Sequence, residues 1–567
     1  MNTILLMVSV FVLYMIAYHS YGRFLGKKIF KLSRKKICPS IKFRDDMDFV
    51  PTRKYILFGH HFTSIAGIGP IVGPAIGIIW GWLPAILWVV LGSIFMGGVH
   101  DLGSLVLSLR NFGRSIGDIA EEYVGRRVKL MFLIIIVLSL WIVIAIFGLV
   151  IAVVFDIFPQ SVIPVFAQIP IAVWLGYQFY KKKSNYILST IVALVILYVA
   201  IYSGSFFQIK LSTILGISPV GQWTIVLLIY AYIASTLPVQ VLLQPRDFIN
   251  AYQLLLTMLL LAVGVVASKP LLVAPMINLS PQGAPSMWPM LFIVIACGAI
   301  SGFHSLVSSG TTSKQCDNEK SALFIGYGSM LTEGVLAVFV IIACGAGIGL
   351  GLEFEGETLF GSDAFQKHYA SWQAAQGMGT KIDAFVTGSS NMIEKIGISQ
   401  KFIITLLGVF IASFAATTLD SATRLQRYII VECSRSFKND LFIKKHPATM
   451  LAVVSALALA FYNGTGKGAL ALWPLFGTCN QLLAGLAFLI ITIYLKRKNI
   501  STFYIFVPML FMLTMTAWAM KINLQNFFSQ SNWLLVSISI IIVVLQIWIL
   551  VESVILLSKN KGISHNQ

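Results

Sequence analysis

The chain has 567 residues, of which 57% are hydrophobic and only 11% charged, and its mean hydropathy is +0.85. Soluble globular proteins carry roughly a quarter charged residues, so this composition excludes a water-soluble enzyme and a disordered scaffold. The net charge of +19 is explained by basic cytoplasmic loops rather than by nucleic-acid binding. We therefore expect a polytopic membrane protein.

Apolar runs separated by charged or turn-rich gaps predict about 15 transmembrane helices. They are residues 2–22, 57–79, 83–109, 130–155, 164–180, 185–203, 222–243, 251–268, 288–309, 322–351, 402–423, 448–463, 469–494, 503–522 and 533–557.

The basic residues orient these helices. Seven Lys and Arg fall within residues 23–36, which places that loop in the cytoplasm and the N-terminus outside. Fifteen alternating spans then put Lys181, Lys182 and Lys496 inside as well, with the C-terminus cytoplasmic. The longest outside loop, residues 352–401, is acidic and contains Trp372. It fits either a solvated surface loop or an external lid.

Two predicted spans contain helix-breaking sequences. The second span has Gly67, Gly69, Pro70 and further Gly and Pro residues in close succession, which a continuous helix does not favour. The seventh span contains Ser235-Thr236-Leu237-Pro238. The two predicted breaks run in opposite directions and are five spans apart, as in transporters built from a five-plus-five inverted repeat. Pro-kinked helices packed by glycines, with no site between them, are the alternative.

This repeat divides the chain into four parts. They are an N-terminal helix with a basic loop (1–56), the first repeat (57–203), the second repeat (222–423, including the loop 352–401) and C-terminal helices (448–557). Free half-helix N-termini near Gly67–Gly69 and Ser235–Leu237 would attract an anionic substrate group.

We single out seven ionisable side chains within the predicted spans, all in the cytoplasmic half. They are His60, His61, His100, Asp101, His304, Glu333 and Asp420. Such residues are costly in a membrane and are functional candidates. Three interpretations remain open: a proton relay, a transition-metal site using His61, His100, Asp101 and His304, or satisfied polar packing.

Two further patterns bear on coupling and on anchoring. Ser308 and Ser309, at the inner end of the ninth span, make Na⁺ coupling a rival to proton coupling. Asp420 and Arg424 are spaced for an ion pair within one helix, and Arg246-Asp247 is placed to anchor a helix end. The six cysteines form no CxxC pair, which favours reduced thiols.

Several blocks resemble the carbon starvation protein A family over about residues 20–495. They are FGHHFTSIAGIGPIVGPAIG, GGVHDLGSLVLSLRNFGRSIGDIAEEYVG, STLPVQVLLQPRDF, ACGAISGFHSLVSSGTTSK, SFAATTLDSATRLQRY and ALWPLFGTCNQLLAGLA. The resemblance implies a bacterial inner-membrane transporter of the amino acid–polyamine–organocation fold type. It also implies uptake of peptides or pyruvate, with proton-coupled import as the usual expectation.

The prediction is therefore a secondary importer of a small carboxylate, pyruvate or a short peptide, and not an enzyme. The sequence contains no HExxH motif, which weighs against an intramembrane zinc protease. We expect no cofactor beyond H⁺ or Na⁺ and no nucleic-acid partner, with the oligomeric state open. The candidate substrate-binding residues are His60, His61, Thr63, Ser64, Gly67, Gly69, Ser235, Thr236, Gln240 and His304. The candidate coupling residues are His100, Asp101, Ser308, Ser309, Glu333 and Asp420.

Overall fold

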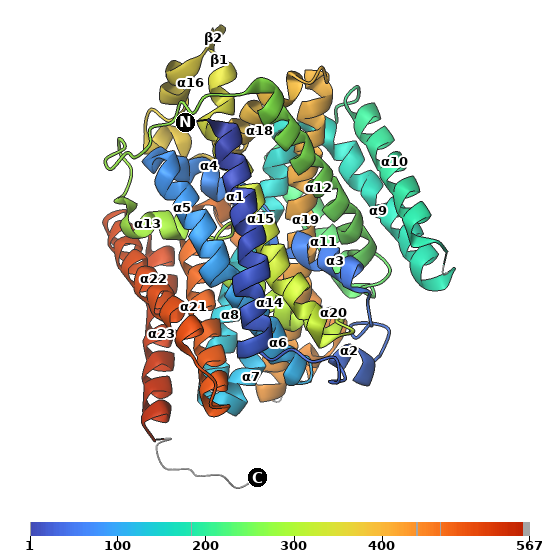
Figure 1. The fold of residues 1–567 in the computed structure, drawn as a ribbon, viewed down its shortest axis with the longest axis vertical. Helices are drawn as coiled ribbons and strands as arrows, with labels where there is room; N and C mark the ends of the chain where they lie inside the picture. Colours follow the sequence, from blue (N-terminus) through green and yellow to red (C-terminus); the bar gives the residue numbers. More distant parts are fainter. Residues whose placement is uncertain (1, 183, 438–439, 465, 560–567) are drawn as a thin grey trace.

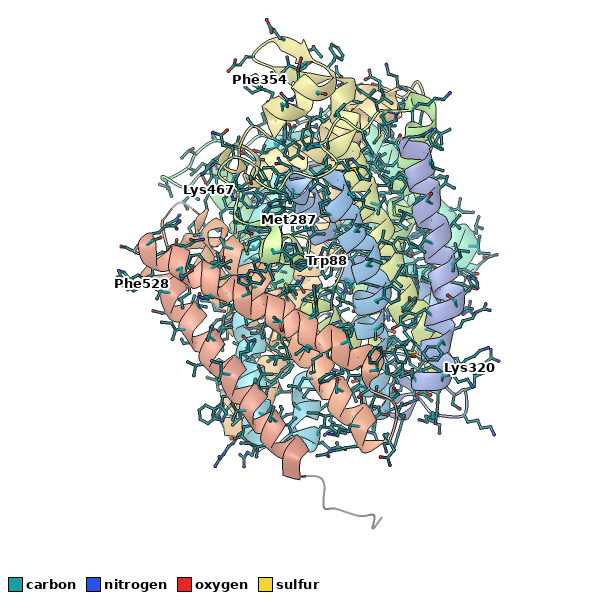
Figure 2. All side chains as sticks on the ribbon, turned by 60° about the vertical axis from the view of Figure 1, so that its left-hand side comes forward. Trp88, Met287, Lys320, Phe354, Lys467 and Phe528 are labelled. Atoms are coloured by element: carbon teal, nitrogen blue, oxygen red, sulfur yellow. The ribbon has the colours of Figure 1, made fainter. Side chains whose placement is uncertain are left out.

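The computed structural model describes residues 2–182, 184–437, 440–464 and 466–559. The described chain is almost entirely helical, and its long helices run side by side from one end of the molecule to the other (Figure 1). We call the end that carries the β-hairpin and α16 the loop end, and the opposite end, which carries α2 and α7, the basic end. The N-terminus lies at the loop end and Lys320 at the basic end, whereas Phe354 marks the tip of the loop end (Figures 1 and 2).

Twelve helical segments among the described residues are long and apolar enough to span a membrane, or 13 if one bent pair is counted as a span. They contain the helices α1 (Thr3–Ala17), α5 (Trp82–Gly92) with α6 (Gly98–Arg110), α8 (Arg126–Ile157), α9 (Val162–Gly176), α10 (Tyr186–Gly204), α11 (Pro219–Thr236), α12 (Leu243–Ser268), α15 (Gly328–Gly345), α19 (Gln400–Phe437), α21 (Trp473–Arg497), α22 (Phe503–Ser529) and α23 (Trp533–Lys559).

The other three predicted spans are helical but shorter or broken. The bent pair is α3 (Lys54–Ile65) with α4 (Gly69–Gly77), whose axes turn by 46°. The segment 288–309 forms two short helices, α13 (Met287–Val294) and α14 (Gly302–Gly310). The third is α20 (Lys445–Phe461), which has 17 residues. Every segment on the predicted list is thus helical, while 12 or 13 meet the length and composition expected of a span.

The first predicted break is confirmed, and the second lies elsewhere. Helix α11 ends at Thr236 and α12 begins at Leu243, so Ser235–Pro238 occupies the end of a helix and the following turn. The second broken helix is instead the α13–α14 pair, with residues 295–301 between its halves. The prediction failed because Pro238 is as suitable for a turn between two helices as for a break within one.

The remaining helices are short and are arranged around the bundle. They are α2 (Pro39–Lys42), α7 (Ile116–Tyr123), α16 (Gly361–His368), α17 (Trp372–Ala375) and α18 (Met378–Glu394). The two strands, β1 (Leu352–Phe354) and β2 (Glu357–Leu359), form an antiparallel hairpin. Its turn residues Glu355 and Gly356 both have positive φ, 52° and 86°, as a tight two-residue hairpin turn requires.

Part of the long loop 352–401 folds back into the bundle. A Cβ on Gly388 of α18 would lie 2.1 Å from the Ala343 carbonyl oxygen of α15, so the two helix backbones are in direct contact. Gly264 of α12 approaches Met392 of α18 in the same way, with the nearest atoms at 3.1 Å. The solvated surface loop that was one prediction for this segment therefore describes the hairpin and the exposed face of α16, but not α18.

Helices α8 and α19 form the centre of the bundle, and α9 and α10 lie at its edge (Figure 1). The apolar window of α19 is 89% buried, whereas that of α10 is only 33% buried. This difference indicates that α10 presents most of its surface to lipid and that the central helices carry the polar groups described next.

Candidate functional site

The two broken helices touch each other through the glycines of α4. Glycines at every fourth position of α4 form one face, and this face packs against the chain around the second break. A Cβ on Gly69 would lie 2.3 Å from Cys297 Sγ, and one on Gly73 would lie 2.5 Å from the Val294 carbonyl oxygen. Gly77 meets Ile295 at 2.5 Å in the same manner. Small residues at this spacing let two membrane helices approach at backbone distance.

Side chains from neighbouring helices satisfy the exposed backbone at the second break. Asn480 Oδ1 accepts the Phe303 amide at 2.9 Å, which caps α14. Gln481 Nε2 donates to the Phe292 carbonyl at 3.0 Å, and Trp88 Nε1 donates to the Ile295 carbonyl at 2.8 Å. Irregular backbone at membrane depth requires such partners. Sequence reasoning missed Asn480 and Gln481, although adjacent amides in an apolar span were a usable signal.

Helix α19 serves the first break in the same way. The Thr417 hydroxyl donates to the Thr63 carbonyl at 3.0 Å, and the Thr418 hydroxyl donates to the Ser64 carbonyl at 3.3 Å. A Cβ on Gly67 would lie 2.4 Å from Thr418 Oγ1, so only glycine fits there. The candidates Thr63, Ser64 and Gly67 are thus placed against α19 at the end of α3.

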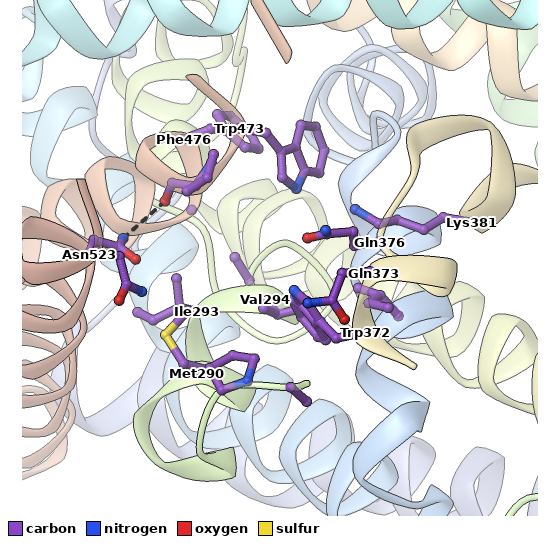
Figure 3. Close-up of a pocket in the computed structure, with 18 of the residues that line it drawn as sticks. Met290, Ile293, Val294, Trp372, Gln373, Gln376, Lys381, Trp473, Phe476 and Asn523 are labelled. Atoms are coloured by element: carbon purple, nitrogen blue, oxygen red, sulfur yellow. Dashed lines mark hydrogen bonds between the residues drawn. The ribbon is translucent and has the colours of Figure 1, made fainter. Parts of the chain in front are cut away.

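A cavity of about 510 Å³ lies beside these breaks, on their loop-end side. Figure 3 shows Lys381 entering it from one side, Asn523 from the opposite side and Trp473 between them. Of the residues predicted to bind substrate, Gly69 is the one that lines it. The other lining groups used below are Cys297, Trp372, Gln373, Gln376, Phe476 and Asn526.

Lys381 of α18 is the one charged side chain among the lining residues. The residue is only 4% exposed, and its Nζ lies 5.1 Å from the centroid of the Trp473 ring. Within the described chain, its ammonium makes no hydrogen bond or ion pair, and burial lowers its pKa to about 7. The sequence predicts this lysine to lie in the outside loop 352–401.

A second polar feature, the His304 cluster, joins three helices and consists of His304, Asp101, His100 and Glu333. His304 Nδ1 of α14 lies 3.0 Å from Asp101 Oδ2 of α6, and His304 Nε2 lies 3.5 Å from Glu333 Oε2 of α15. His100 Nδ1 lies 2.9 Å from Asp101 Oδ1. All four side chains are fully buried. The structure thus brings together four of the seven ionisable residues, with one imidazole between two carboxyl groups.

A third feature, the Arg246 network, consists of His60, Asp247, Arg246, Asp420 and Tyr230 and links α3, α11, α12 and α19. His60 Nδ1 lies 2.6 Å from Asp247 Oδ2, and Arg246 lies 3.6 Å from Asp247 and 2.6 Å from Asp420. The Tyr230 hydroxyl donates to Asp420 at 3.0 Å and accepts from Arg246. The network therefore holds α3, α11, α12 and α19 together next to the first break.

The predicted ion pair between Asp420 and Arg424 does not form. Arg424 instead pairs with Asp48 of the 43–53 loop at 3.1 Å, and Asp420 pairs with Arg246. The loop partner lies 376 residues away in sequence, which is why spacing within one helix did not reveal it. Nearby cations, chiefly Arg424, outweigh burial and lower the pKa of Asp48.

The remaining candidates are dispersed. Ser235 and Thr236 donate their hydroxyls to the carbonyls of Tyr232 and Ile233 at the end of α11, and Gln240 donates to the Asp46 carbonyl at the basic end. As the C-terminal end of a helix, Ser235–Leu237 offers carbonyls and not the free amides that were predicted.

The side chains proposed to bind Na⁺ or a transition metal differ in their hydrogen-bond partners. Ser309 donates to the Ser305 carbonyl and accepts from the Ile116 amide, whereas the Ser308 hydroxyl has no partner among the described residues. His61 Nδ1 lies 2.8 Å from Thr312 Oγ1. Among the described residues, no group of three or more His, Cys, Asp or Glu side chains is arranged to hold a metal ion.

The architecture resembles that of a known transporter. A crystal structure of the Eremococcus coleocola manganese transporter matches with a TM-score of 0.51 and 12% identity, covering 90% of this chain and 99% of that one. At this identity the likeness shows the fold alone. The described protein is therefore an all-helical membrane protein with a transporter fold.

Comparison with known sequences identifies the family. The peptide transporter CstA of Campylobacter jejuni is 33% identical, over 91% of this chain and 79% of its own. The pyruvate/proton symporter BtsT of Escherichia coli is 30% identical, over 90% and 80%. The model of the carbon starvation protein CstA family matches residues 2–519. These matches cover nearly the whole chain, and it belongs to the carbon starvation protein CstA family of membrane transporters.

Proposed function

We propose that this protein is a proton-coupled importer of a small carboxylate nutrient, pyruvate or a short peptide, in the bacterial inner membrane. The observation that carries the proposal is the cavity of about 510 Å³ that reaches the contact between two broken helices. Relatives named for peptide transport and for pyruvate/proton symport support the substrate class. Substrate sites at broken helices near the bilayer midplane are typical of secondary transporters.

The loop end faces outside in this proposal. Basic residues gather at the opposite end, for instance in residues 23–36 and around Lys496–Lys498, and positive loops stay in the cytoplasm. The N-terminus is then outside and the C-terminus cytoplasmic, which an odd number of spans requires. In this orientation the cavity lies on the outer side of the broken helices and the Arg246 network on the cytoplasmic side, which is the arrangement expected of an outward-facing state.

Helix α4 supplies a binding element for the carboxylate. Its first residue, Gly69, lines the cavity, and no side chain caps this helix. Pro70 has no N–H, and the Ile71 and Val72 amides donate to the Ile68 carbonyl, so the start of α4 offers an anion the Gly69 amide and the positive end of the helix dipole. Helix α14 differs, because Asn480 already occupies the Phe303 amide.

The His304 cluster is the proposed proton carrier. His304 sits on the short helix α14 and faces one carboxyl group on α6 and another on α15. Neither Glu333 oxygen makes a hydrogen bond within the described chain, and a buried carboxyl without donors is less costly when protonated. A proton moving between Asp101, His304 and Glu333 would change the charge that binds α14 to α6 and α15, which couples protonation to movement of the half-helix.

Opening to the cytoplasm requires α3 to separate from α12 and α19. The contacts that must break are those of the Arg246 network, chiefly His60 with Asp247 and the threonine bonds from α19. Candidates from the sequence that line the closed side, His61 and Ser64 among them, would meet substrate in that inward-facing state.

Na⁺ coupling is the second candidate function. The unpartnered Ser308 hydroxyl favours it. A tightly bound metal at His61, His100, Asp101 and His304 has less support, because no group of three or more His, Cys, Asp or Glu side chains among the described residues is arranged to hold one.

Uptake by proteoliposomes tests the proposal. Purified protein would be reconstituted and given labelled pyruvate with an inward proton gradient, then competed with unlabelled pyruvate or dipeptides. Gradient-dependent accumulation supports the proposal, and the effective competitor identifies the substrate. Accumulation that depends on a Na⁺ gradient and not on a pH gradient would show that the coupling ion is Na⁺ and not H⁺. The absence of uptake of both compounds by folded protein would refute the function.

A further inference from the structure

Lys381 occupies an unusual position for a lysine in a membrane transporter. It belongs to the loop that follows α15, yet α18 carries it into the wall of the cavity, where it is 4% exposed. Other lysines of this loop, such as Lys367 and Lys395, remain exposed. Burial of an amine without a counter-ion is costly, so its placement requires an explanation.

The cavity wall contains no acid that neutralises this amine. The other polar side chains lining it are the amides Gln373, Gln376, Asn523, Asn526 and Gln530, apart from the Cys297 thiol and the indole nitrogens. Amide nitrogens donate hydrogen bonds to an anion, and a neutral amide oxygen is a weaker partner for the lysine than a carboxylate is. The only described contact of Lys381 Nζ with a charged or π group is the face of Trp473 at 5.1 Å, which keeps the amine directed into the cavity (Figure 3).

We infer that Lys381 is the outer carboxylate-binding residue of this transporter. The carboxylate of an incoming substrate pairs with the Lys381 ammonium and receives hydrogen bonds from the surrounding amides, before it reaches the uncapped start of α4 at Gly69. The inference rests on the proposed function, which supplies the carboxylate. It assigns a residue that contacts the substrate, identifies the side of the cavity where the carboxylate binds, and explains selectivity for anions.

The aromatic side chains beside Lys381 are consistent with such a ligand. Trp372, Trp473 and Phe476 line the same cavity and offer apolar surface to the remainder of the substrate. A small carboxylate with a short apolar part has this combination of one charge and one apolar side. An inorganic cation has neither, and the lysine would repel it.

The ionisation of Lys381 adds an independent consequence. Burial lowers its pKa to about 7, so the amine is charged below pH 7 and neutral above it. The ionisable groups around it are Asp383 on the same helix, His368 on α16 and the Cys297 thiol across the cavity, and none of them forms an ion pair with it among the described residues. Carboxylate affinity from the outside should therefore fall as the external pH rises through 7.

The decisive experiment compares three variants for pyruvate and dipeptide uptake in right-side-out vesicles. Lys381→Gln removes the charge, Lys381→Arg keeps it at all relevant pH values, and Lys367→Gln removes an exposed lysine that lies over the Phe354 ring in the same loop, as a matched control. Loss of a charge-assisted bond should raise KM about 10- to 100-fold in Lys381→Gln, with maximal rate changed much less. Lys381→Arg and Lys367→Gln should remain near wild type.

The pH profile separates an ionic role from a structural one. The KM of the wild type should rise above pH 7, whereas the KM of Lys381→Arg should lack this rise. Any effect of pH through the coupling proton is the same in both proteins, so the difference between them reports on Lys381. An unchanged KM in Lys381→Gln, or the same pH profile in wild type and Lys381→Arg, would overturn the inference.

A binding measurement keeps the inference independent of transport. Acetate, pyruvate and a dipeptide would be tested at pH 6 for stabilisation of the detergent-solubilised protein against heating. Stabilisation of wild type and Lys381→Arg but not of Lys381→Gln supports the carboxylate site even if the transported substrate is another compound. Equal stabilisation of all three proteins contradicts it, while failure of uptake alone contradicts only the proposed function.

Discussion

Replacement of Gly69 by alanine tests the contact between the two broken helices most directly. The new methyl group would lie 2.3 Å from Cys297 Sγ and 2.6 Å from Cys297 Cβ, closer than any atoms pack. Because Gly69 begins α4 and Cys297 lies in the non-helical segment between α13 and α14, neither can move without disturbing a break. Overpacking of this kind costs about 1–3 kcal/mol, which corresponds to a roughly 5- to 160-fold shift in an equilibrium constant.

The structure also specifies how this damage can be repaired. With Cys297→Gly, the nearest remaining atom to the new methyl group is the Cα of residue 297 at 4.0 Å, an ordinary contact. With Cys297→Ala, the clash with Cβ at 2.6 Å persists. Gly69→Ala should therefore be rescued by Cys297→Gly and only weakly by Cys297→Ala.

The assay is initial uptake normalised to the amount of folded protein, together with the apparent melting temperature in detergent. Gly148→Ala in α8 is the control, because a methyl group there would meet Leu228 at 3.5 Å and should be tolerated. A Gly69→Ala protein with normal uptake and melting, or a Cys297→Gly double variant no better than the Cys297→Ala one, would refute the reasoning.

Three further predictions concern the buried charges and the cavity. Asp101→Asn and His304→Ala should abolish accumulation driven by a pH gradient while substrate exchange persists, measured in proteoliposomes; retained accumulation would remove the His304 cluster from coupling. Arg246→Met leaves Asp420 unpaired and should destabilise the protein by about 3–5 kcal/mol, and adding Asp420→Asn should recover part of the folded yield seen by size exclusion; equal yields in all three proteins would contradict the Arg246 network. Cys297 should react with a membrane-impermeant thiol reagent applied from the outside and be protected by substrate, because it lines the open cavity; labelling only from the cytoplasmic side would reverse the proposed orientation.

Local rules explain why the first break was predictable from the sequence. Gly67, Gly69 and Pro70 remove helix propensity and amide donors within one short stretch, and this effect does not depend on neighbours. The class of protein and the positions of the apolar helices follow in the same way from composition and run length. For one group of side chains the sequence predicts only a similar depth in the membrane and not their mutual contacts, because buried ionisable groups lie where they find partners. These side chains are His100, Asp101, His304 and Glu333.

The second break depended on tertiary contacts. Residues 295–301 contain no proline and one glycine, and their departure from the helix depends on partners from other helices. Trp88 satisfies the Ile295 carbonyl, while Asn480 and Gln481 satisfy backbone groups on either side of the stretch, the Phe303 amide and the Phe292 carbonyl. Such distant partners cannot be read from local sequence, in which Ser235–Pro238 has the stronger break signal, so the sequence predicts the break there.

Charge pairing and loop placement were likewise decided by the fold. Asp420 had a partner at helical spacing, but Arg246 and Tyr230 lie closer in space, and Arg424 is drawn to Asp48. Lys381 is an ordinary loop lysine in sequence, and packing of α18 against α15 through Gly388 turns it into the one charge of the cavity. The sequence by itself thus determined the membrane class, the family, the apolar helices and one broken helix, because these depend on composition and local propensity. Only the tertiary structure decided the second break, the ion pairs and the cavity, because each depends on contacts between residues far apart in the chain.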